Sequence, residues 1–188
     1  LEEKQKAVMA FLFAKNANGT SGLYMALQEG CGDAIKKFGE ILIQAAKEKW
    51  IDKTQLENLL AAKRADELPG LFMALRKGHD KAIRLFGEIL IQAAEEEWID
   101  QAQLANLLAA KRANGTPGLY MALQNGCNEA IKAFGEILSQ AAKEKWIDQA
   151  QLANLLAAKD ANGISGLKIA LQKGYSVTIT AFDQILRT

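Results

Sequence analysis

The stretch WIDKTQLENLLAAK at residues 50–63 returns as WIDQAQLANLLAAK at 98–111 and, letter for letter, at 146–159. The tryptophans that open these copies are 48 residues apart, with no insertions between them. A constant period of this size indicates a repeat protein in which each repeat buries its apolar face against its neighbours. We therefore predict an all-α, ankyrin-like, right-handed solenoid of three-helix repeats with a 48-residue period. The same spacing separates a set of glycines, namely Gly22, Gly70, Gly118 and Gly166.

The repeat boundaries predict a single repeat domain over residues 1–188. It comprises a partial repeat at 1–17, full repeats at 18–65, 66–113 and 114–161, and a shortened repeat at 162–188. The chain begins with Leu1 rather than methionine, so we expect a fragment of a longer protein. In the last repeat, Thr178, Thr180 and Asp183 add polarity to the second helix, as expected of a terminal repeat whose outer face meets water.

The composition favours a soluble helical protein. Hydrophobic residues make up 49% of the 188 residues, charged residues 24%, and the net charge is +1, a balance that implies no polyanionic partner such as nucleic acid. Only two prolines interrupt long runs of good helix formers. No stretch approaches the roughly 20 apolar residues that span a bilayer, so we expect no membrane partner.

The first helix of the repeat is clearest in NGTPGLYMALQNG at 114–126. Thr116 is the expected N-cap, Pro117 the first helical residue, and Gly126 the residue just past the end. Tyr24, Phe72 and Tyr120, each followed by methionine, recur in this helix. They either line a hydrophobic recognition groove or, as we favour, pack between repeats.

The second helix is expected over residues 33–49, with an apolar stripe of Ile35, Phe38, Leu42, Ala45 and Ala46. A glycine inside this helix costs about 1 kcal/mol, and its recurrence predicts the close approach of another backbone. The glycines concerned are Gly39, Gly87 and Gly135.

The third helix begins with a capping signature. Asp52 is the expected N-cap, Gln55 can reach back to it, and Ile51 can contact Leu56 across the cap. A metal-binding or acid role for Asp52 is the weaker alternative.

The string at 114–134 resembles the ankyrin repeat, because Thr116, Pro117, Leu119, Ala122 and Gly126 match its signature. The third helix is expected to take the place of the ankyrin β-hairpin finger. The longer phrase AAKRANGTPGLYMALQNG at 109–126 is similar to the repeat region of bacterial type III secreted effectors of the EspL/OspD enterotoxin-like family. That resemblance implies a virulence protein secreted into the host cytosol, whose repeats bind a host protein, and it carries no catalytic residue onto this chain.

We find no catalytic, cofactor-binding or metal-binding motif. Cys31, His79, Cys127 and Tyr175 occupy equivalent positions, so a stacking step of roughly 10 Å should separate neighbours. A catalytic set or a disulfide cannot form at such distances, and we expect free thiols. His79 is expected to bond local backbone rather than a metal. The run Glu95–Glu97 is either an acidic docking patch or, as we favour, a solvated helix end.

We expect a monomer that binds a protein through its repeat surface. The alternative is a substrate-docking or regulatory arm of a larger enzyme whose catalytic region lies outside this chain. Candidate contact residues are those that differ between otherwise similar repeats, because stacking should not fix them. They form three sets: Asn16, Arg64, Arg112 and Asp160; Gln28, Arg76, Gln124 and Gln172; and Glu29, Lys77, Asn125 and Lys173.

Overall fold

The computed structural model describes residues 1–187, and within that range every regular element is an α-helix. Twelve helices are present there: α1 (Glu2–Leu12), α2 (Gly22–Glu29), α3 (Gly32–Lys47), α4 (Lys53–Ala61), α5 (Gly70–Lys77), α6 (Asp80–Glu95), α7 (Gln101–Ala109), α8 (Gly118–Asn125), α9 (Asn128–Lys143), α10 (Gln149–Ala157), α11 (Gly166–Lys173) and α12 (Ser176–Leu186).

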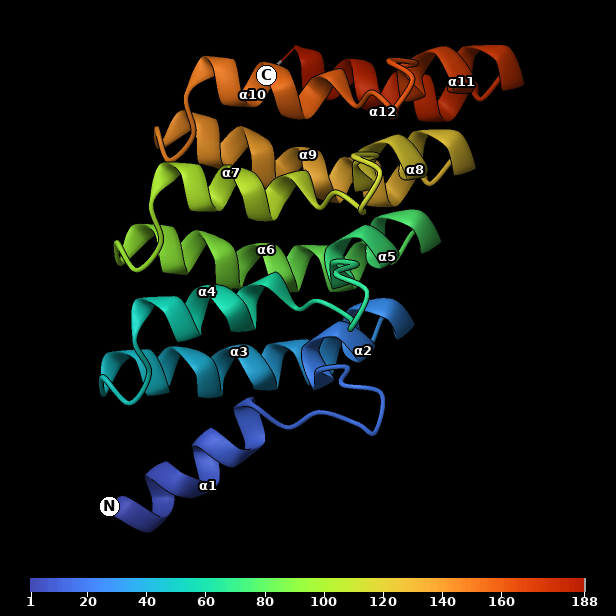
Figure 1. Ribbon diagram of the computed structural model, residues 1–188. Coiled ribbons are helices and arrows are strands. Elements are labelled where there is room, and N and C mark those ends of the chain that lie inside the picture. Colours follow the sequence, from blue (N-terminus) through green and yellow to red (C-terminus); the bar gives the residue numbers. More distant parts are fainter. Residues whose placement is uncertain (188) are drawn as a thin grey trace.

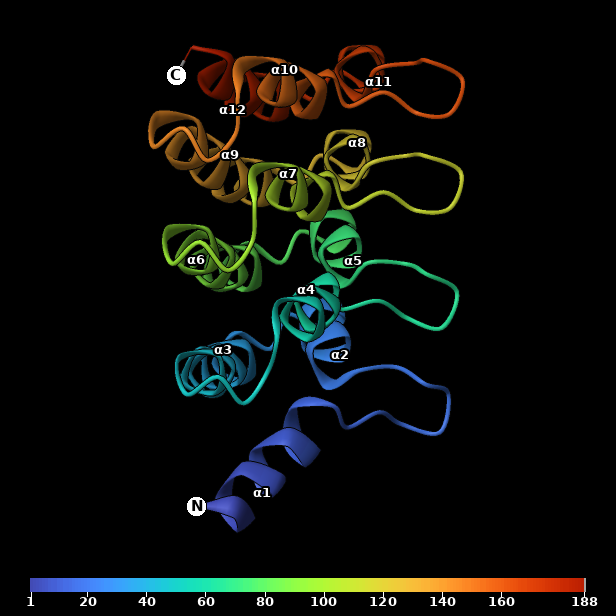
Figure 2. The same ribbon diagram turned by 60° about the vertical axis from the view of Figure 1, so that its left-hand side comes forward.

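The helices form three columns that run along the molecule (Figures 1 and 2). We call α2, α5, α8 and α11 the A helices, α3, α6, α9 and α12 the B helices, and α4, α7 and α10 the C helices. Each A helix packs on the next A helix and each B helix on the next B helix, whereas neighbouring C helices touch only lightly. Helices 48 residues apart in the sequence therefore lie side by side.

The A helices begin one residue later than the sequence predicts. In α8 the N-cap is Pro117 rather than Thr116. Thr116 is buried, and its hydroxyl makes no hydrogen bond with any described residue. The prediction failed because the Thr116 carbonyl is held by the Arg112 amide at 3.1 Å, which keeps this residue in the preceding loop. The expected end is confirmed, since Gly126 adopts the left-handed conformation at φ 69°.

The C helices begin as predicted. In α4, Asp52 Oδ1 accepts a hydrogen bond from the Gln55 amide at 2.7 Å, and Gln55 Oε1 accepts one from the Asp52 amide at 3.0 Å. The same reciprocal box opens α7 and α10. These bonds satisfy amides that the first helical turn leaves without partners.

The B helices are amphipathic, and their buried faces form the centre of the molecule. In α3 the stripe residues Ile35, Phe38, Leu42 and Ala45 are buried, while Ala46 is half-buried. The helix spans Gly32–Lys47 rather than 33–49, because Lys49 takes a positive φ of 56° in the turn before Trp50. Helix α12 also contributes to the core, since Thr178 is buried and hydrogen-bonded to Asn128. The expectation that Thr178 adds polarity to an outer face was wrong.

The helical glycines make room for a side chain rather than for a backbone, contrary to prediction. A Cβ at Gly39 would lie 2.6 Å from Ile89 Cδ1, and one at Gly87 would lie 2.3 Å from Ile137 Cδ1. The close backbone approach occurs instead in the A helices. There, a Cβ at Gly118 would lie 3.2 Å from Phe72 Cα.

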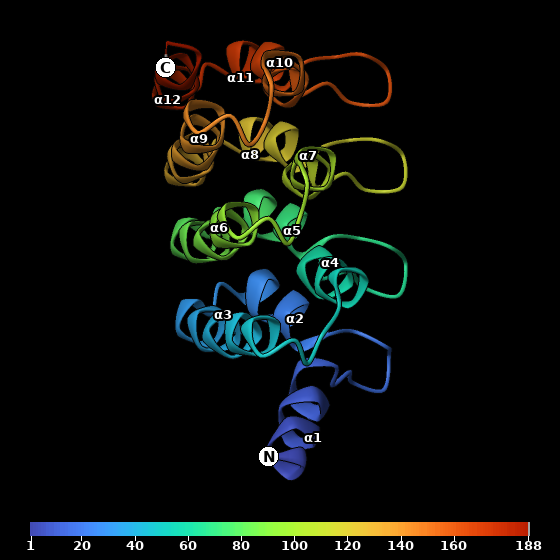
Figure 3. The same cartoon turned by 90° about the vertical axis from the view of Figure 1, so that its left-hand side faces the viewer.

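Hairpin loops are present as well as the C helices, so the expectation that the third helix replaces them was wrong. Four isolated antiparallel bridges close the hairpin loops at Lys15–Ser21, Lys63–Pro69, Lys111–Pro117 and Lys159–Ser165. The loops follow the C helices, or α1 in the first case, and project from the stack (Figure 3).

Candidate protein-interaction surface

The first set of candidate residues opens the turn of each hairpin loop. The backbone amides of Asn16, Arg64, Arg112 and Asp160 each donate to the carbonyl four residues ahead, at 2.9–3.1 Å. Asn16 and Asp160 also accept backbone amides through their side chains. The structure therefore assigns these residues a part in shaping the turn.

The same position also contacts an aromatic ring in the first helix of its own repeat. The guanidinium carbon of Arg64 lies 5.9 Å from the centre of the Tyr24 ring, and that of Arg112 lies 5.9 Å from the centre of the Phe72 ring. Such cation–π contacts contribute roughly 0.5–1 kcal/mol at exposed sites. Tyr24, Phe72 and Tyr120 are buried. Burial confirms the prediction that these rings pack between repeats and do not line a recognition groove.

The hairpin charges influence nearby acidic groups. Burial raises the pKa of the Tyr120 hydroxyl, and the carboxylate of Asp160 raises it further. In the second loop, Arg64 Nε donates to Asp66 Oδ1 at 2.8 Å. This hydrogen bond lowers the pKa of Asp66 to about 2.

The third set of candidates comprises Glu29, Lys77, Asn125 and Lys173. These residues were predicted to be free of stacking contacts, but the structure shows that they join neighbouring repeats. Lys77 Nζ lies 3.7 Å from Glu29 Oε1 in the preceding repeat. Asn125 Nδ2 donates to the Arg76 carbonyl at 2.9 Å, and Lys173 Nζ donates to the Gln124 carbonyl at 2.9 Å. These residues differ between repeats, yet each is used to join one A helix to the next.

In the second set of candidates, two exposed side chains remain free for a partner, but Gln28 is not one of them. Gln28 donates to the adjacent Glu29 at 2.8 Å. The exposed side chains of Arg76 and Gln172 form no hydrogen bond or ion pair with any residue in 1–187. Because the Arg76 carbonyl accepts the amide of Asn125, its backbone is held while its guanidinium stays available.

His79 bonds the preceding repeat rather than local backbone. Its Nε2 lies 3.0 Å from the Gln28 carbonyl oxygen. Cys127 occupies the same position one repeat later and contacts the Arg76 carbonyl through Sγ at 3.7 Å.

Cys31 and Cys127 are both free, as predicted, and burial raises the pKa of the Cys127 thiol. No metal-binding group of His, Cys, Asp or Glu side chains occurs among the described residues.

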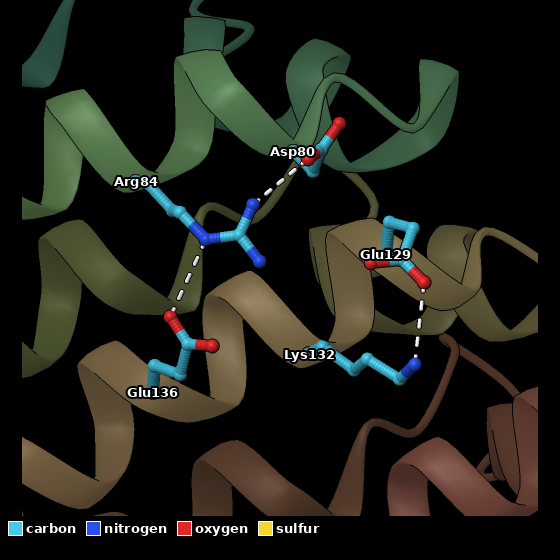
Figure 4. A network of polar contacts seen from close by, with 5 residues as sticks. All are labelled: Asp80, Arg84, Glu129, Lys132 and Glu136. Atoms are coloured by element: carbon cyan, nitrogen blue, oxygen red, sulfur yellow. Dashed lines mark hydrogen bonds and ion pairs between the residues drawn. The ribbon is translucent and has the colours of Figure 1, made fainter.

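An ion-pair network that sequence analysis did not identify joins two B helices (Figure 4). Arg84 Nη1 lies 2.8 Å from Asp80 Oδ2 in α6, and Arg84 Nε lies 3.4 Å from Glu136 Oε2 in α9. Arg84 and Glu136 are 52 residues apart in the sequence. An alignment of the repeats could have identified Arg84 as a candidate, because it differs from the other copies. Arg84 stands where the other two full repeats have lysine, at Lys36 and Lys132.

Grooves lie between the C helices, at the base of the hairpin loops. One, which we call the α7–α10 groove, has a volume of about 510 Å³. The corresponding groove between α1 and α4 uses equivalent residues two repeats earlier. The floor of the α7–α10 groove is apolar and includes Leu108, Ala109, Pro117, Leu119, Phe134 and Leu155.

Comparison with known proteins supports the fold alone. No protein-family model matches the chain, and no curated protein matches it. The chain resembles a solved structure titled "DHF91 filament", with a TM-score of 0.60 and 15% sequence identity. The match covers 98% of this chain and 95% of that one. No helix within residues 1–187 has the length and apolar character needed to cross a membrane.

Proposed function

We propose that this chain is the protein-interaction module of a secreted bacterial effector, built as a right-handed, ankyrin-like solenoid with a 48-residue repeat. Its partner is a host protein. The recurrence of equivalent helices side by side along three columns supports the solenoid. A stack of this kind offers a long continuous face in place of a single enclosed pocket.

The main support for a binding role is the exposed, unpaired guanidinium of Arg76 at the end of α5. Its guanidinium is exposed and has no partner among the described residues, although its backbone is held by the next repeat. Arginine is enriched at the energetic centres of protein interfaces, because its planar head makes several directed hydrogen bonds.

The test is a quantitative pull-down from host-cell lysate with the wild-type chain, Arg76→Glu and Arg76→Gln. Glutamine is the native residue at positions 28, 124 and 172, so Arg76→Gln is a matched control for folding. We expect Arg76→Glu to lose a partner that the wild type retains, and Arg76→Gln to weaken it. Identical capture by all three proteins, with unchanged circular dichroism, would contradict this role for Arg76.

A further inference from the structure

The α7–α10 groove is bordered by four polar side chains that have no structural task. Asn106 and Asn154 are exposed on the C helices, and Lys111 and Lys159 are exposed at the start of the hairpin loops. All four line the groove. None of them forms a side-chain hydrogen bond or ion pair with another residue in 1–187. Two amides and two ammonium groups therefore surround an apolar floor with their bonding capacity unused.

The chain itself shows what satisfies a lysine at this position. In the second hairpin loop, Lys63 Nζ lies 2.9 Å from Glu67 Oε2. The residues equivalent to Glu67 in the next two loops are Gly115 and Gly163, so Lys111 and Lys159 lack this internal carboxylate. The acidic residue next to Lys159 in sequence, Asp160, already accepts the amides of Asn162 and Ile164 through its side chain.

We propose that the α7–α10 groove binds an extended acidic peptide segment of a partner protein. Carboxylates of the segment pair with Lys111 and Lys159, and an apolar side chain between them enters the groove over Leu155. The amides of Asn106 and Asn154 bond the peptide backbone, since each offers two donors and one acceptor.

The spacing of the repeats suits an extended chain. Packed helices lie roughly 8–10 Å apart, and a polyproline II chain advances about 3.1 Å per residue with three residues per turn, so its positions i and i+3 share one face. Equivalent side chains on α7 and α10 therefore meet peptide positions about three residues apart. The preferred segment carries acidic residues at that spacing with an apolar residue between them. The inference rests on the proposed protein-binding function, but Arg76 does not line this groove, so the two proposals can fail separately.

The sharpest test supplies the missing carboxylates from within the chain. The variant Gly115→Glu/Gly163→Glu recreates the Lys63–Glu67 arrangement in both loops. Because it replaces glycines, it removes no native side-chain contact. Glu67 occupies its position at φ 65°, and a Cβ at Gly115 or Gly163 meets nothing within 4 Å. The matched control, Gly115→Gln/Gly163→Gln, carries the same backbone strain without charge.

Binding is measured by fluorescence anisotropy with a labelled peptide, Ser-Gly-Glu-Leu-Thr-Glu-Ser-Gly. The comparison probes replace both glutamates with glutamine or with lysine. We expect the acidic probe to bind on the order of tenfold more tightly than the lysine probe, the scale set by two exposed ion pairs. The double glutamate variant should lose that preference, and the glutamine control should keep it. Arg76→Glu should leave binding of this probe unchanged.

The proposal is overturned if the acidic probe does not bind, if it binds no better than the lysine probe, or if the double glutamate variant binds it like wild type. Tighter binding of single-stranded oligothymidylate than of the acidic probe would also overturn it, in favour of a nucleic-acid site. If the double glutamate variant fails to fold, Lys111→Gln/Lys159→Gln provides the same comparison. Loss of the preference then supports the proposal, and its retention contradicts it.

Discussion

His79 reaches back into the preceding repeat, where its Nε2 lies 3.0 Å from the carbonyl oxygen of Gln28. A carbonyl can only accept, so Nε2 carries the proton and acts as donor. The ring also fills the space beside Gly30, where a Cβ would lie 2.7 Å from His79 Nδ1. One side chain thus joins two repeats by a hydrogen bond and by packing.

Removing this side chain should weaken the contact between the first two full repeats. We expect His79→Ala to lower the free energy of unfolding by about 1–2 kcal/mol, because a hydrogen bond and its packing are lost. His79→Cys is the matched control, since cysteine is native at positions 31 and 127, and it should cost less. Urea denaturation followed by circular dichroism measures both. Equal stability of wild type and His79→Ala would show that the contact contributes nothing.

Adding a methyl group at Gly87 should displace the Ile137 side chain that packs against it from α9. A Cβ there would lie 2.3 Å from Ile137 Cδ1, and overpacking of this kind costs roughly 1–3 kcal/mol. We expect Gly87→Ala to destabilise the chain in urea denaturation, by less than the full overpacking cost because alanine recovers about 1 kcal/mol of helix propensity. Gly22→Ala is the control, because a Cβ at Gly22 meets no atom within 4 Å.

A double-mutant cycle identifies the cause of that destabilisation. Ile137→Ala removes the side chain that occupies the space of the new methyl group. If the clash is the cause, the double variant Gly87→Ala/Ile137→Ala loses less stability than the two single changes together. Strict additivity would show that the glycine serves another purpose.

These positions also show what sequence reasoning reaches and what it misses. The box formed by Asp52 and Gln55 was predicted correctly because both partners lie within one helical turn. The partners of His79 and Gly87 lie in adjacent repeats, 51 and 50 residues away, and local patterns carry no information about which atoms meet across that distance. The repeat period predicted that neighbouring repeats stack, but not which side chains join them.

The candidate surface was predicted less well, for a physical reason. Variation between repeats does not mean freedom from stacking, because Asn125 and Lys173 each reach a carbonyl of the preceding A helix. Different side chains can perform the same joining role, so variation alone does not separate binding residues from structural ones. The lysines and asparagines of the α7–α10 groove were missed because they are the same in each copy.

The pair formed by Arg64 and Asp66 predicts a dependence of stability on pH. The pKa of Asp66 is lowered to about 2 by the guanidinium of Arg64. A carboxylate with a lowered pKa stabilises the fold above its ordinary pKa of about 4, and that contribution disappears as the pH falls toward 2. We expect the stability difference between wild type and Asp66→Asn to be largest above pH ~5 and to vanish near pH 2.

Urea denaturation at a series of pH values measures this difference, and Arg64→Gln provides the control. Without the guanidinium, Asp66→Asn should change stability little at any pH. A difference between wild type and Asp66→Asn that persists unchanged down to pH 2 would contradict the assignment.

The two thiols should differ in reactivity. Cys31 is exposed, whereas Cys127 is half-buried and burial raises the pKa of its thiol. Thiolate is the reactive form, so a raised pKa slows reaction at a given pH. We expect Cys127 in the Cys31→Ser variant to react more slowly with a disulfide reagent at pH 8 than Cys31 does in the Cys127→Ser variant. Faster reaction of Cys127 would show that this position opens readily in solution.

Small-angle X-ray scattering of the monomeric chain tests the stacked architecture most directly, because every proposal above depends on it. A compact domain of this length has a radius of gyration of about 16 Å. Repeats stacked in one direction predict a clearly larger value and a distance distribution with a long tail. A radius near 16 Å with a symmetric distribution, measured on a sample whose forward scattering corresponds to a monomer, would contradict the account.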